Sequence, residues 1–315
     1  MTQQFYSNGK LLLTGEYAVL DGALSLALPC RYGQSLNVTA HTKPEIQWTS
    51  KDDQGSIWFQ SVFKLQPIKE KQSTLAKIKG LNEKEIVATA EMLIKILTEA
   101  QKLNPNFLSG KQGYSIDTKL DFPRKWGLGS SSTLINNVAK WSHTDAQMLL
   151  QRTFGGSGYD IACAQHNKPI QYLIEPKNNR PEVQIVDFDP PFKEQLYFVY
   201  LNKKQNSREG IAQYRKQKFD TPKLVAEISR LTQDITLCKD LGQFNIFIEA
   251  HEAILSNVLQ IPTIKESHFS DFEGAVKSLG AWGGDFILAT GNKKTPRYFK
   301  EKGYETIIPY SKMIL

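Results

Sequence analysis

A run of glycines and serines in the middle of the chain has residue types that suit a phosphate group: Gly127-Leu128-Gly129-Ser130-Ser131-Ser132. Glycine lets the backbone come close to a ligand, and the free N–H groups at a helix start favour an anion. Strand-like alternation over 113–118 precedes the run, and apolar residues at helical spacing follow it over 133–141. The run is therefore expected where a strand turns into a helix. A tight turn with a serine N-cap explains the same residues, and the lysine that ends a Walker A loop is missing.

Two other glycine-containing segments, Gly9-Lys10 and Gly280–Gly284, also adjoin expected strands. Loops of this kind present backbone N–H groups that bind anions. If the three segments meet in the fold, they form one cradle for phosphates.

The first half of the chain is expected to be rich in strands, with one strong amphipathic helix over 82–102 that Asn82 caps. A hairpin is predicted around 52–55, and a short helix is predicted over 145–153. The expected strands cover 10–13, 23–28, 34–39, 46–49, 56–60, 113–118, 170–174 and 183–188.

The second half is expected to be rich in helices. Loop markers at 177–181 and 189–191 favour a boundary between a domain of residues 1–190 and a domain of residues 191–315. The expected helices cover 208–218, 221–238, 241–259, a shorter stretch near 270–279, and 296–302. The expected strands cover 196–201, 286–290 and 305–308.

Composition narrows the function classes. The 315 residues, of which 40% are hydrophobic, suffice for two domains with sizeable cores. The three cysteines lie far apart without a CxxC pair, which predicts neither a zinc site nor a disulfide framework and fits a reducing cytosol. No signal peptide and no membrane-spanning apolar run is found, so a cytoplasmic protein is expected. The net charge is +7, but the sequence has no tight run of lysines and arginines interleaved with aromatics of the kind that binds nucleic acid. Lysines over 64–84 fit either a solvated surface or mild steering of an anionic substrate.

Four motifs resemble, in order along the chain, those of the GHMP kinases, the superfamily of galactokinase, homoserine kinase, mevalonate kinase and phosphomevalonate kinase. The pattern Pro-x-x-x-Gly-Leu-Gly-Ser-Ser over 123–131 is the most specific of the four. The other three are Gly9 to Leu20, Ser157-Gly158-Tyr159-Asp160, and Gly280-Ala281-Trp282-Gly283-Gly284-Asp285. Each is weak alone, whereas all four in order, in suitable strand and helix context, carry the resemblance.

Details within these motifs are similar to the isoprenoid branch of the superfamily. Gly15 to Leu20, Lys125-Trp126 and Gly283-Gly284-Asp285 look like phosphomevalonate kinases. The string Gly158-Tyr159-Asp160-Ile161-Ala162 also resembles a bacterial subgroup, the GYDIA-type GHMP kinases.

The resemblance implies roles for individual residues. Lys10 and Asp160 match the catalytic pair, in which the carboxylate orients or deprotonates the acceptor hydroxyl and the lysine offsets developing charge. Ser131 matches the serine whose hydroxyl reaches Mg²⁺. The residues implied to wrap the ATP phosphates are Gly127, Leu128, Gly129, Ser130, Ser131 and Ser132. Those implied for the substrate and phosphate loops are Glu16, Tyr17, Ser157, Gly280, Ala281, Gly283 and Gly284.

Some of these roles stay open at the level of sequence. Glu16 and Tyr17 fit a structural role as well as a pocket lining. Ser207 fits an ordinary helix cap better than a contact with the acceptor. His143, His166 and His251 show no partner pattern and are interpreted as surface or core residues.

The sequence departs from the family pattern in two places. Many relatives carry a glutamate about ten residues before the catalytic aspartate as a second Mg²⁺ ligand, whereas residues 147–151 contain no acid. Trp282 stands where the family usually has glycine, so its ring must either narrow the pocket or point away from it.

The resemblance implies an α+β, two-domain GHMP kinase fold, with an N-terminal domain like ribosomal protein S5 domain 2 and a ferredoxin-like C-terminal domain. It implies ATP-dependent phosphorylation of phosphomevalonate, with ATP and Mg²⁺ as cofactors and a small molecule as the only substrate partner. Mevalonate is the alternative acceptor. A catalytically weak nucleotide- or metabolite-binding relative and a decarboxylase of diphosphomevalonate are the competing functions. No nucleic acid or membrane partner is expected, and a homodimer is left open.

Overall fold

The computed structural model describes residues 2–65, 68–70, 83–175, 180–205 and 207–315. It divides into two compact units, and strands β1 (Thr2–Thr14) and β2 (Ser25–His41) contribute residues to both. The first unit comprises Met1–Gly9, Tyr32–Arg124 and Leu128–Gln165, and the second comprises Lys10–Arg31, Lys125–Gly127 and His166–Leu315. The predicted domain boundary at residue 190 stays a prediction.

The first unit is built on a mixed sheet of strand order β5-β4-β3-β6-β2, with β1 also paired to β2. The β3–β6 pair is parallel and the other pairs in this series are antiparallel. Alternate residues of β3, among them Ile46 and Trp48, are buried, so one face of the strand serves the core. The new strands are β3 (Glu45–Lys51), β4 (Ile57–Leu65), β5 (Ile68–Glu70) and β6 (Gly113–Leu120). The predicted hairpin around 52–55 is confirmed as β3–β4.

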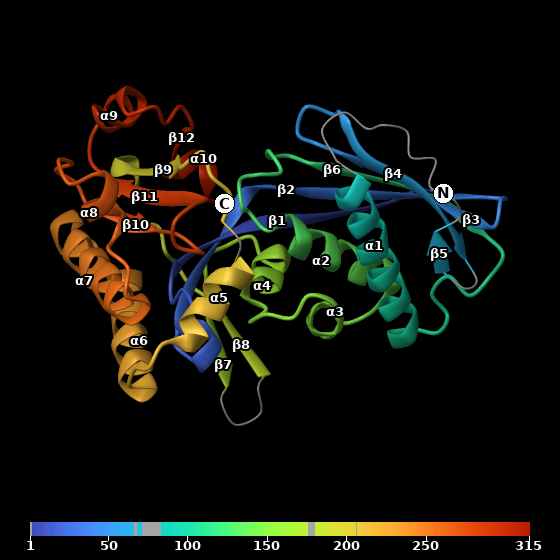
Figure 1. Cartoon of the computed structure of the whole chain (residues 1–315), viewed down its shortest axis with the longest axis horizontal. Coiled ribbons are helices and arrows are strands. Elements are labelled where there is room, and N and C mark those ends of the chain that lie inside the picture. The colour runs from blue at the N-terminus through green and yellow to red at the C-terminus, as the bar shows by residue number, and fades with distance from the viewer. Residues whose placement is uncertain (1, 66–67, 71–82, 176–179, 206) are drawn as a thin grey trace. The chain divides into compact units, whose positions relative to one another are not determined.

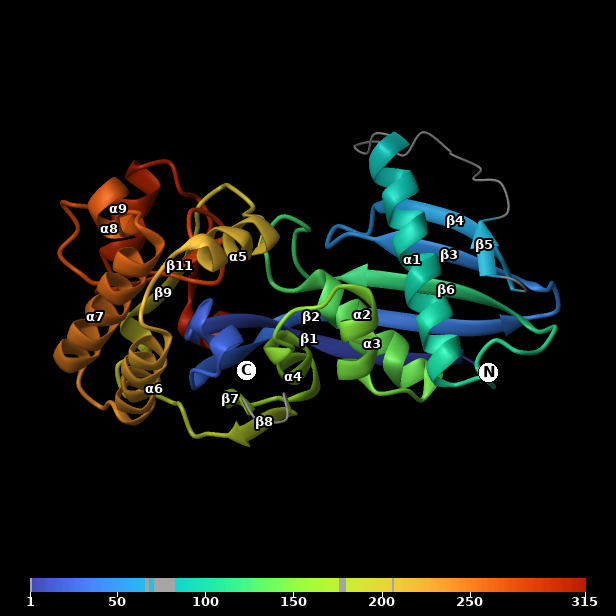
Figure 2. The ribbon, with the colours of Figure 1, turned by 60° about the horizontal axis from the view of Figure 1, so that its bottom comes forward.

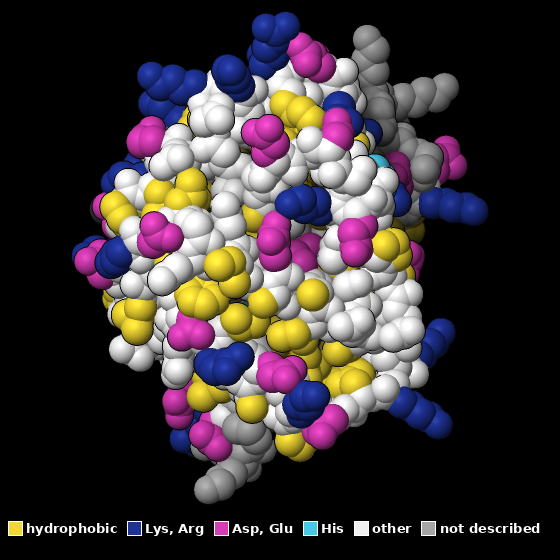
Figure 3. All heavy atoms as spheres, turned by 90° about the vertical axis from the view of Figure 1, so that its left-hand side faces the viewer, with side chains coloured by type: hydrophobic (Ala, Val, Ile, Leu, Met, Phe, Trp, Pro, Cys, Tyr) yellow, Lys and Arg dark blue, Asp and Glu magenta, His cyan; other side chains and the backbone are white. Residues whose placement is uncertain are grey.

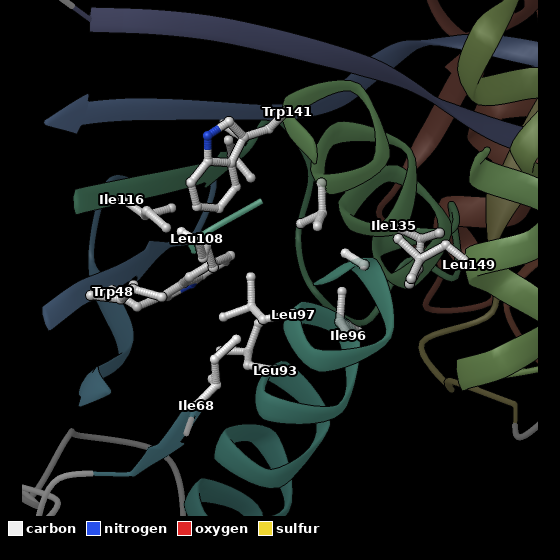
Figure 4. Packing of buried hydrophobic residues seen from close by; sticks show 14 of the residues in the cluster. Trp48, Ile68, Leu93, Ile96, Leu97, Leu108, Ile116, Ile135, Trp141 and Leu149 are labelled. Carbon is white, nitrogen blue, oxygen red and sulfur yellow. The ribbon is translucent and has the colours of Figure 1, made fainter. Parts of the chain in front are cut away.

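Helices α1 (Glu83–Leu103), α2 (Ser130–Ser142) and α3 (Ala146–Thr153) cover one face of this sheet (Figures 1 and 2). Figure 4 shows Leu93 and Leu97 of α1 beside Trp48 of the sheet, with Trp141 of α2 in the same apolar cluster. The amphipathic helix that the sequence predicts is therefore confirmed. Asn82, its expected cap, lies outside the described residues, as do Lys71, Lys77 and Lys79 of the lysine-rich segment.

The second unit contains an antiparallel sheet of order β10-β11-β9-β12 and a hairpin, β7–β8, that pairs with the first part of β2. Every residue of β9 and β11 is buried, which explains their unbroken apolar sequences. The strands are β7 (Ile170–Glu175), β8 (Arg180–Ile185), β9 (Leu196–Tyr200), β10 (Val276–Ser278), β11 (Phe286–Thr290) and β12 (Ile307–Pro309). The helices are α5 (Ser207–Lys216), α6 (Thr221–Leu237), α7 (Leu241–Leu259), α8 (Ile264–His268), α9 (Thr295–Glu301) and α10 (Tyr310–Met313).

The helix predicted near 270–279 is wrong, because residues 276–278 form strand β10. Val276 pairs with Ala289 of β11, and a Cβ added to Gly274 would lie 1.9 Å from the Thr290 carbonyl oxygen. The backbone therefore approaches β11 too closely for a helix. Apolar residues at Phe272 and Val276 have helical spacing, which is why sequence periodicity misleads here.

One face of the second unit carries apolar side chains among charged ones (Figure 3). Leu237 at the end of α6 is 75% exposed and Ile246 on α7 is 65% exposed. In the described part of the chain, every helix is too short or too polar to cross a membrane.

Candidate functional site

The serine run of the first unit forms the start of helix α2. Gly129 precedes the helix with φ +86°, a conformation that favours glycine, and it has no side chain to cap the first turn. The Thr133 N–H bonds to the Gly129 carbonyl, but no described residue accepts a hydrogen bond from the N–H of Ser130, Ser131 or Ser132. Unpaired N–H donors at the positive end of a helix dipole favour an anion.

The serine hydroxyls of this run differ in their exposure to solvent. Ser131 is exposed, whereas Ser132 is buried and its hydroxyl donates to the Gly129 carbonyl at 2.8 Å. Leu128 is fully buried, so its side chain belongs to the core and only its backbone can face a ligand. Gly9 of β1 lies close by, since a Cβ there would be 2.9 Å from the Leu128 carbonyl oxygen.

A buried polar network that sequence reasoning missed holds α2 in place. The Thr133 hydroxyl donates to Gln34 Oε1 at 2.7 Å, and Asn137 donates to the Gln34 carbonyl at 2.8 Å. Ser7 of β1 donates to Asn137 at 2.7 Å and accepts from Asn136 at 2.8 Å. Two adjacent asparagines between the apolar residues Ile135 and Val138 were the available signal, because buried amides need partners.

Asp160 lies in the first turn of α4 (Tyr159–Gln165), after a loop in which Gly155, Gly156 and Gly158 all have positive φ. The glutamines of α3 hold this loop. Gln147 Nε2 donates to the Gly158 carbonyl and Gln151 Nε2 donates to the Gly156 carbonyl, each at 2.9 Å. The stretch that lacks the expected acid thus uses its amides to position the loop before Asp160.

In the second unit, Lys10 is half-buried in β1, and Gly127 lies against Asp285. A Cβ on Gly127, whose φ is +69°, would lie 2.4 Å from the carboxyl carbon of Asp285. Asp285 accepts a hydrogen bond from the Gln205 N–H at 3.1 Å. Burial raises the pKa of Asp285, and the positive charge of Lys10 partly opposes this. Asp285 is a site candidate that the motif contained but that sequence reasoning did not select.

The loop 280–284 offers further backbone donors in the same unit. Gly280 and Gly283 have positive φ, and a Cβ at either would meet no atom within 4 Å. Among the described residues, none accepts a hydrogen bond from the N–H of Gly280, Ala281, Gly283 or Gly284. The Trp282 ring is only 5% exposed and packs in an apolar cluster with Tyr17 and Tyr214, so it points into the core.

Glu16 and His251 are both buried, and His251 is a core residue as predicted. Glu16 Oε1 accepts from Lys277 Nζ at 2.6 Å, and the Gly15 N–H donates to His251 Nε2 at 3.0 Å. Burial raises the pKa of Glu16 to about 7, although Lys277 opposes the rise. Lys277 and Glu252 gave no sequence signal, because only the fold brings them to Glu16.

The residues present fit Mg²⁺ delivered with ATP better than a metal cage made by protein alone. Within the described ranges, no three His, Cys, Asp or Glu side chains are grouped to hold a metal ion. Mg²⁺ commonly takes one or two protein ligands and completes its shell with phosphates and water. The exposed hydroxyl of Ser131 suits that role, whereas the amides of Gln147 and Gln151 are engaged with the loop.

A scan against protein-family models found no match, and a search of curated proteins also found none. Solved structures do match over nearly the whole chain. Mevalonate kinase from Methanococcus jannaschii is 17% identical, with 96% of this chain and 94% of that chain covered and a TM-score of 0.68. Phosphomevalonate kinase from Streptococcus pneumoniae, in complex with phosphomevalonate and AMPPNP, is 15% identical, with 95% of each chain covered and a TM-score of 0.64.

Galactokinase from Lactococcus lactis, complexed with galactose, is 12% identical, with 95% of this chain and 88% of that chain covered and a TM-score of 0.60. These enzymes are named for chemically different acceptors, so the structural similarity does not identify an acceptor for this chain. What they share with this protein is the arrangement of elements. The chain therefore has the α+β fold of these kinases, as its motifs predict.

Proposed function

We propose that the protein is an ATP-dependent GHMP-type kinase that transfers the γ-phosphoryl group of ATP to an acceptor of the mevalonate pathway, phosphomevalonate first and mevalonate second. The observation that carries the proposal is the uncapped start of α2, with the free N–H groups of Ser130, Ser131 and Ser132. It stands in a fold shared with kinases, one of them solved with phosphomevalonate and AMPPNP. The four ordered motifs and the likeness of three of their segments to phosphomevalonate kinases support this choice.

Phosphoryl transfer depends on positioning and charge neutralisation more than on covalent chemistry. The N–H groups at the start of α2 would bind the ATP phosphates, with Gly127, Leu128 and Gly129 leading the backbone into that position. The N–H groups of Gly280, Ala281, Gly283 and Gly284 would bind a second anionic group. Mg²⁺, held by ATP and Ser131, would supply charge neutralisation at the phosphates.

Lys10 and Asp160 would act on the reacting atoms. The Lys10 ammonium would stabilise negative charge on the transferred group, and Asp160 would orient the acceptor. An acceptor hydroxyl, as in mevalonate, must lose a proton, whereas a phosphate ester is already largely ionised at neutral pH because its second pKa is about 6. The loss caused by Asp160→Asn is therefore expected to be larger with mevalonate than with phosphomevalonate. Ser157 lies in the same loop and would support the acceptor from there.

A coupled ADP-release assay tests the acceptor. The panel contains phosphomevalonate, mevalonate, homoserine and galactose, with ATP and Mg²⁺ in excess. Turnover with phosphomevalonate at a higher kcat/KM than with mevalonate supports the proposal. Turnover only with homoserine or galactose would refute the assignment to the mevalonate pathway but would still support a kinase activity. Scoring CO₂ release with diphosphomevalonate in the same assay separates a decarboxylase.

A nucleotide- or metabolite-binding protein with weak catalysis is the second candidate. The observation that favours it is the pair Gln147 and Gln151, which occupy the stretch of α3 where an acidic ligand is usual and which bond to backbone carbonyls instead. ATP binding by calorimetry without ADP release for any acceptor would support this candidate. Turnover that Asp160→Asn abolishes would exclude it.

A further inference from the structure

Four ionisable side chains meet in the interior of the second unit: Glu16, His251, Glu252 and Lys277, each at most 2% exposed. Lys277 Nζ donates to Glu16 Oε1 at 2.6 Å, to Glu252 Oε1 at 3.3 Å and to the Ser278 carbonyl at 3.0 Å. A buried ion pair contributes little more to stability than well-packed apolar residues of the same volume. The segments that this cluster holds in place therefore matter more than its contribution to stability.

The cluster joins three elements. Glu16 comes from the turn Gly15–Tyr17, which follows the strand that carries Lys10. His251 and Glu252 come from α7, and Lys277 comes from β10. The Gly15 N–H donates to His251 Nε2 at 3.0 Å, and the Ser278 N–H donates to Glu252 Oε2 at 3.1 Å. The turn is thus held to His251, and β10, which directly precedes loop 280–284, is held to the adjacent Glu252.

The protonation states fit this geometry. Burial, aided by the charge of Lys277, lowers the pKa of His251, so its Nε2 is free to accept from Gly15. Burial also raises the pKa of both Glu16 and Glu252, and Lys277 opposes the rise in each. One cation therefore faces two carboxyl groups, and one proton on either carboxyl balances the charge.

The same turn holds the loop at a second point. The Trp282 N–H donates to the Tyr17 hydroxyl oxygen at 3.2 Å. The Tyr17 ring stacks on Tyr214 with centroids 5.4 Å apart, and a Cβ on Gly210 of α5 would lie 2.5 Å from the hydroxyl oxygen, so Tyr17 has little room to move. The backbone N–H of Trp282 makes this bond, whereas the N–H groups of Gly280, Ala281, Gly283 and Gly284 have no acceptor among the described residues.

We propose that Glu16, Tyr17 and Lys277 are positioning residues that hold loop 280–284 in the conformation that presents its free N–H groups to a phosphate. Lys277 on β10, bonded to Glu16, fixes the start of the loop, and Tyr17 fixes its middle. Glu16 and Tyr17 both belong to the turn that ends the Lys10 strand. The kinetic consequence rests on the proposed kinase function, whereas the structural consequence does not.

Hydrogen exchange of the full-length protein without ligand tests the structural part. Lys277→Met leaves the two carboxyl groups without their cation, and it is expected to speed amide exchange in a peptide covering 279–285 about tenfold. Tyr17→Phe removes only the hydroxyl and is the second variant if Lys277→Met does not fold. It is expected to speed exchange at Trp282 alone. Ile228→Val is the control for lost packing, because Ile228 belongs to the same apolar cluster as Tyr17 and Trp282. The change costs about 0.5–1.5 kcal/mol of stability and leaves the four ionisable side chains unchanged.

The kinetic part uses a pH profile. In Lys277→Met the two carboxyl groups stay protonated in mild acid and repel each other once both ionise. The ratio of wild-type to variant kcat/KM is therefore expected to grow about tenfold between about pH 6 and about pH 9. For Ile228→Val the ratio is expected to stay flat, because packing alone does not titrate.

The outcomes separate the two proposals. If exchange over 279–285 in both Lys277→Met and Tyr17→Phe matches that in Ile228→Val, the inference is overturned, whether or not the protein is a kinase. An active wild type with a flat ratio for Lys277→Met also overturns it. A wild type inactive with every acceptor refutes the proposed function, and the exchange data then decide the inference alone.

Discussion

At the residue scale, the loop before Asp160 is held by amides where a carboxylate is common. Gln147 and Gln151 each donate to a loop carbonyl, and Gly158 has φ +86° with a Cβ position only 2.1 Å from Gln147 Oε1. A glutamate cannot donate this bond, because an ionised carboxylate only accepts. The position of Asp160 therefore depends on the amide of Gln147.

The variant Gln147→Glu tests this dependence. A carboxylate facing the Gly158 carbonyl would repel it, and the loop that places Asp160 would shift. We expect kcat/KM to fall by about 10²-fold with a small change in Tm. Met148→Glu is the matched control, since Met148 is 49% exposed and takes the same charge on the neighbouring position. Equal kinetics for both variants would show that Gln147 does not position the site.

The buried carboxyl of Glu16 predicts a pH effect on stability. Its pKa is about 7 in the folded chain and 4.5 in the unfolded chain. A raised pKa means that the folded state holds the proton more tightly, so its stabilising effect is full below pH 4.5 and is lost as pH rises through 7. The loss is on the order of 3 kcal/mol. Urea unfolding of Glu16→Gln is expected to show a shallower decline between these values, and parallel pH profiles for the two proteins would contradict it.

At the element scale, much of the fold was predictable from periodicity. The amphipathic helix α1, the β3–β4 hairpin and the buried strands β9 and β11 carry strong patterns, and all are confirmed. The segment around 270–279 was not predictable, because a three-residue strand such as β10 is decided by its pairing with β11 rather than by its own spacing.

The candidate site was predictable only where its residues are close in sequence. The serine run was correctly expected at a helix start, since glycine and serine have strong local preferences. The partners Gln34 and Lys277 come from distant strands, so no local pattern reveals them. Whether Lys10 and Asp160 act as a catalytic pair stays a prediction.

The polar anchor of α2 makes a stability prediction for this element. Thr133→Val removes the donor to Gln34 Oε1 and leaves that buried oxygen unpaired. We expect a loss of about 1–3 kcal/mol in the free energy of unfolding. Thr133→Ser keeps the hydroxyl and is expected to retain most of it, as measured by urea denaturation. Similar losses in the two variants would mean that packing of the methyl group, not the hydrogen bond, matters.

At the scale of the whole molecule, each compact unit carries a different share of the proposed machinery. The first unit supplies Asp160 and the start of α2, and the second supplies Lys10 and loop 280–284. Lys10→Met and Asp160→Asn are expected to be strongly non-additive in kcat, because residues that act on one transition state lose most of their effect together.

A double-mutant cycle measures this dependence. Each single variant is expected to lower kcat about 10²–10⁴-fold, and the kcat of the double variant is expected to be only slightly below that of the less active single variant. Full additivity of the two losses would mean that Lys10 and Asp160 act on separate steps.

The central claim is the transfer of a phosphoryl group with Asp160 orienting the acceptor. The most direct measurement follows ATP and phosphomevalonate by ³¹P NMR, with wild-type protein and with Asp160→Asn of equal thermal stability. We predict that the wild type converts the pair into ADP and diphosphomevalonate, and that the variant is slower by a factor of about 10² or more. Asp160→Asn with a rate near that of the wild type, or a wild type that leaves both compounds unchanged, would contradict the claim.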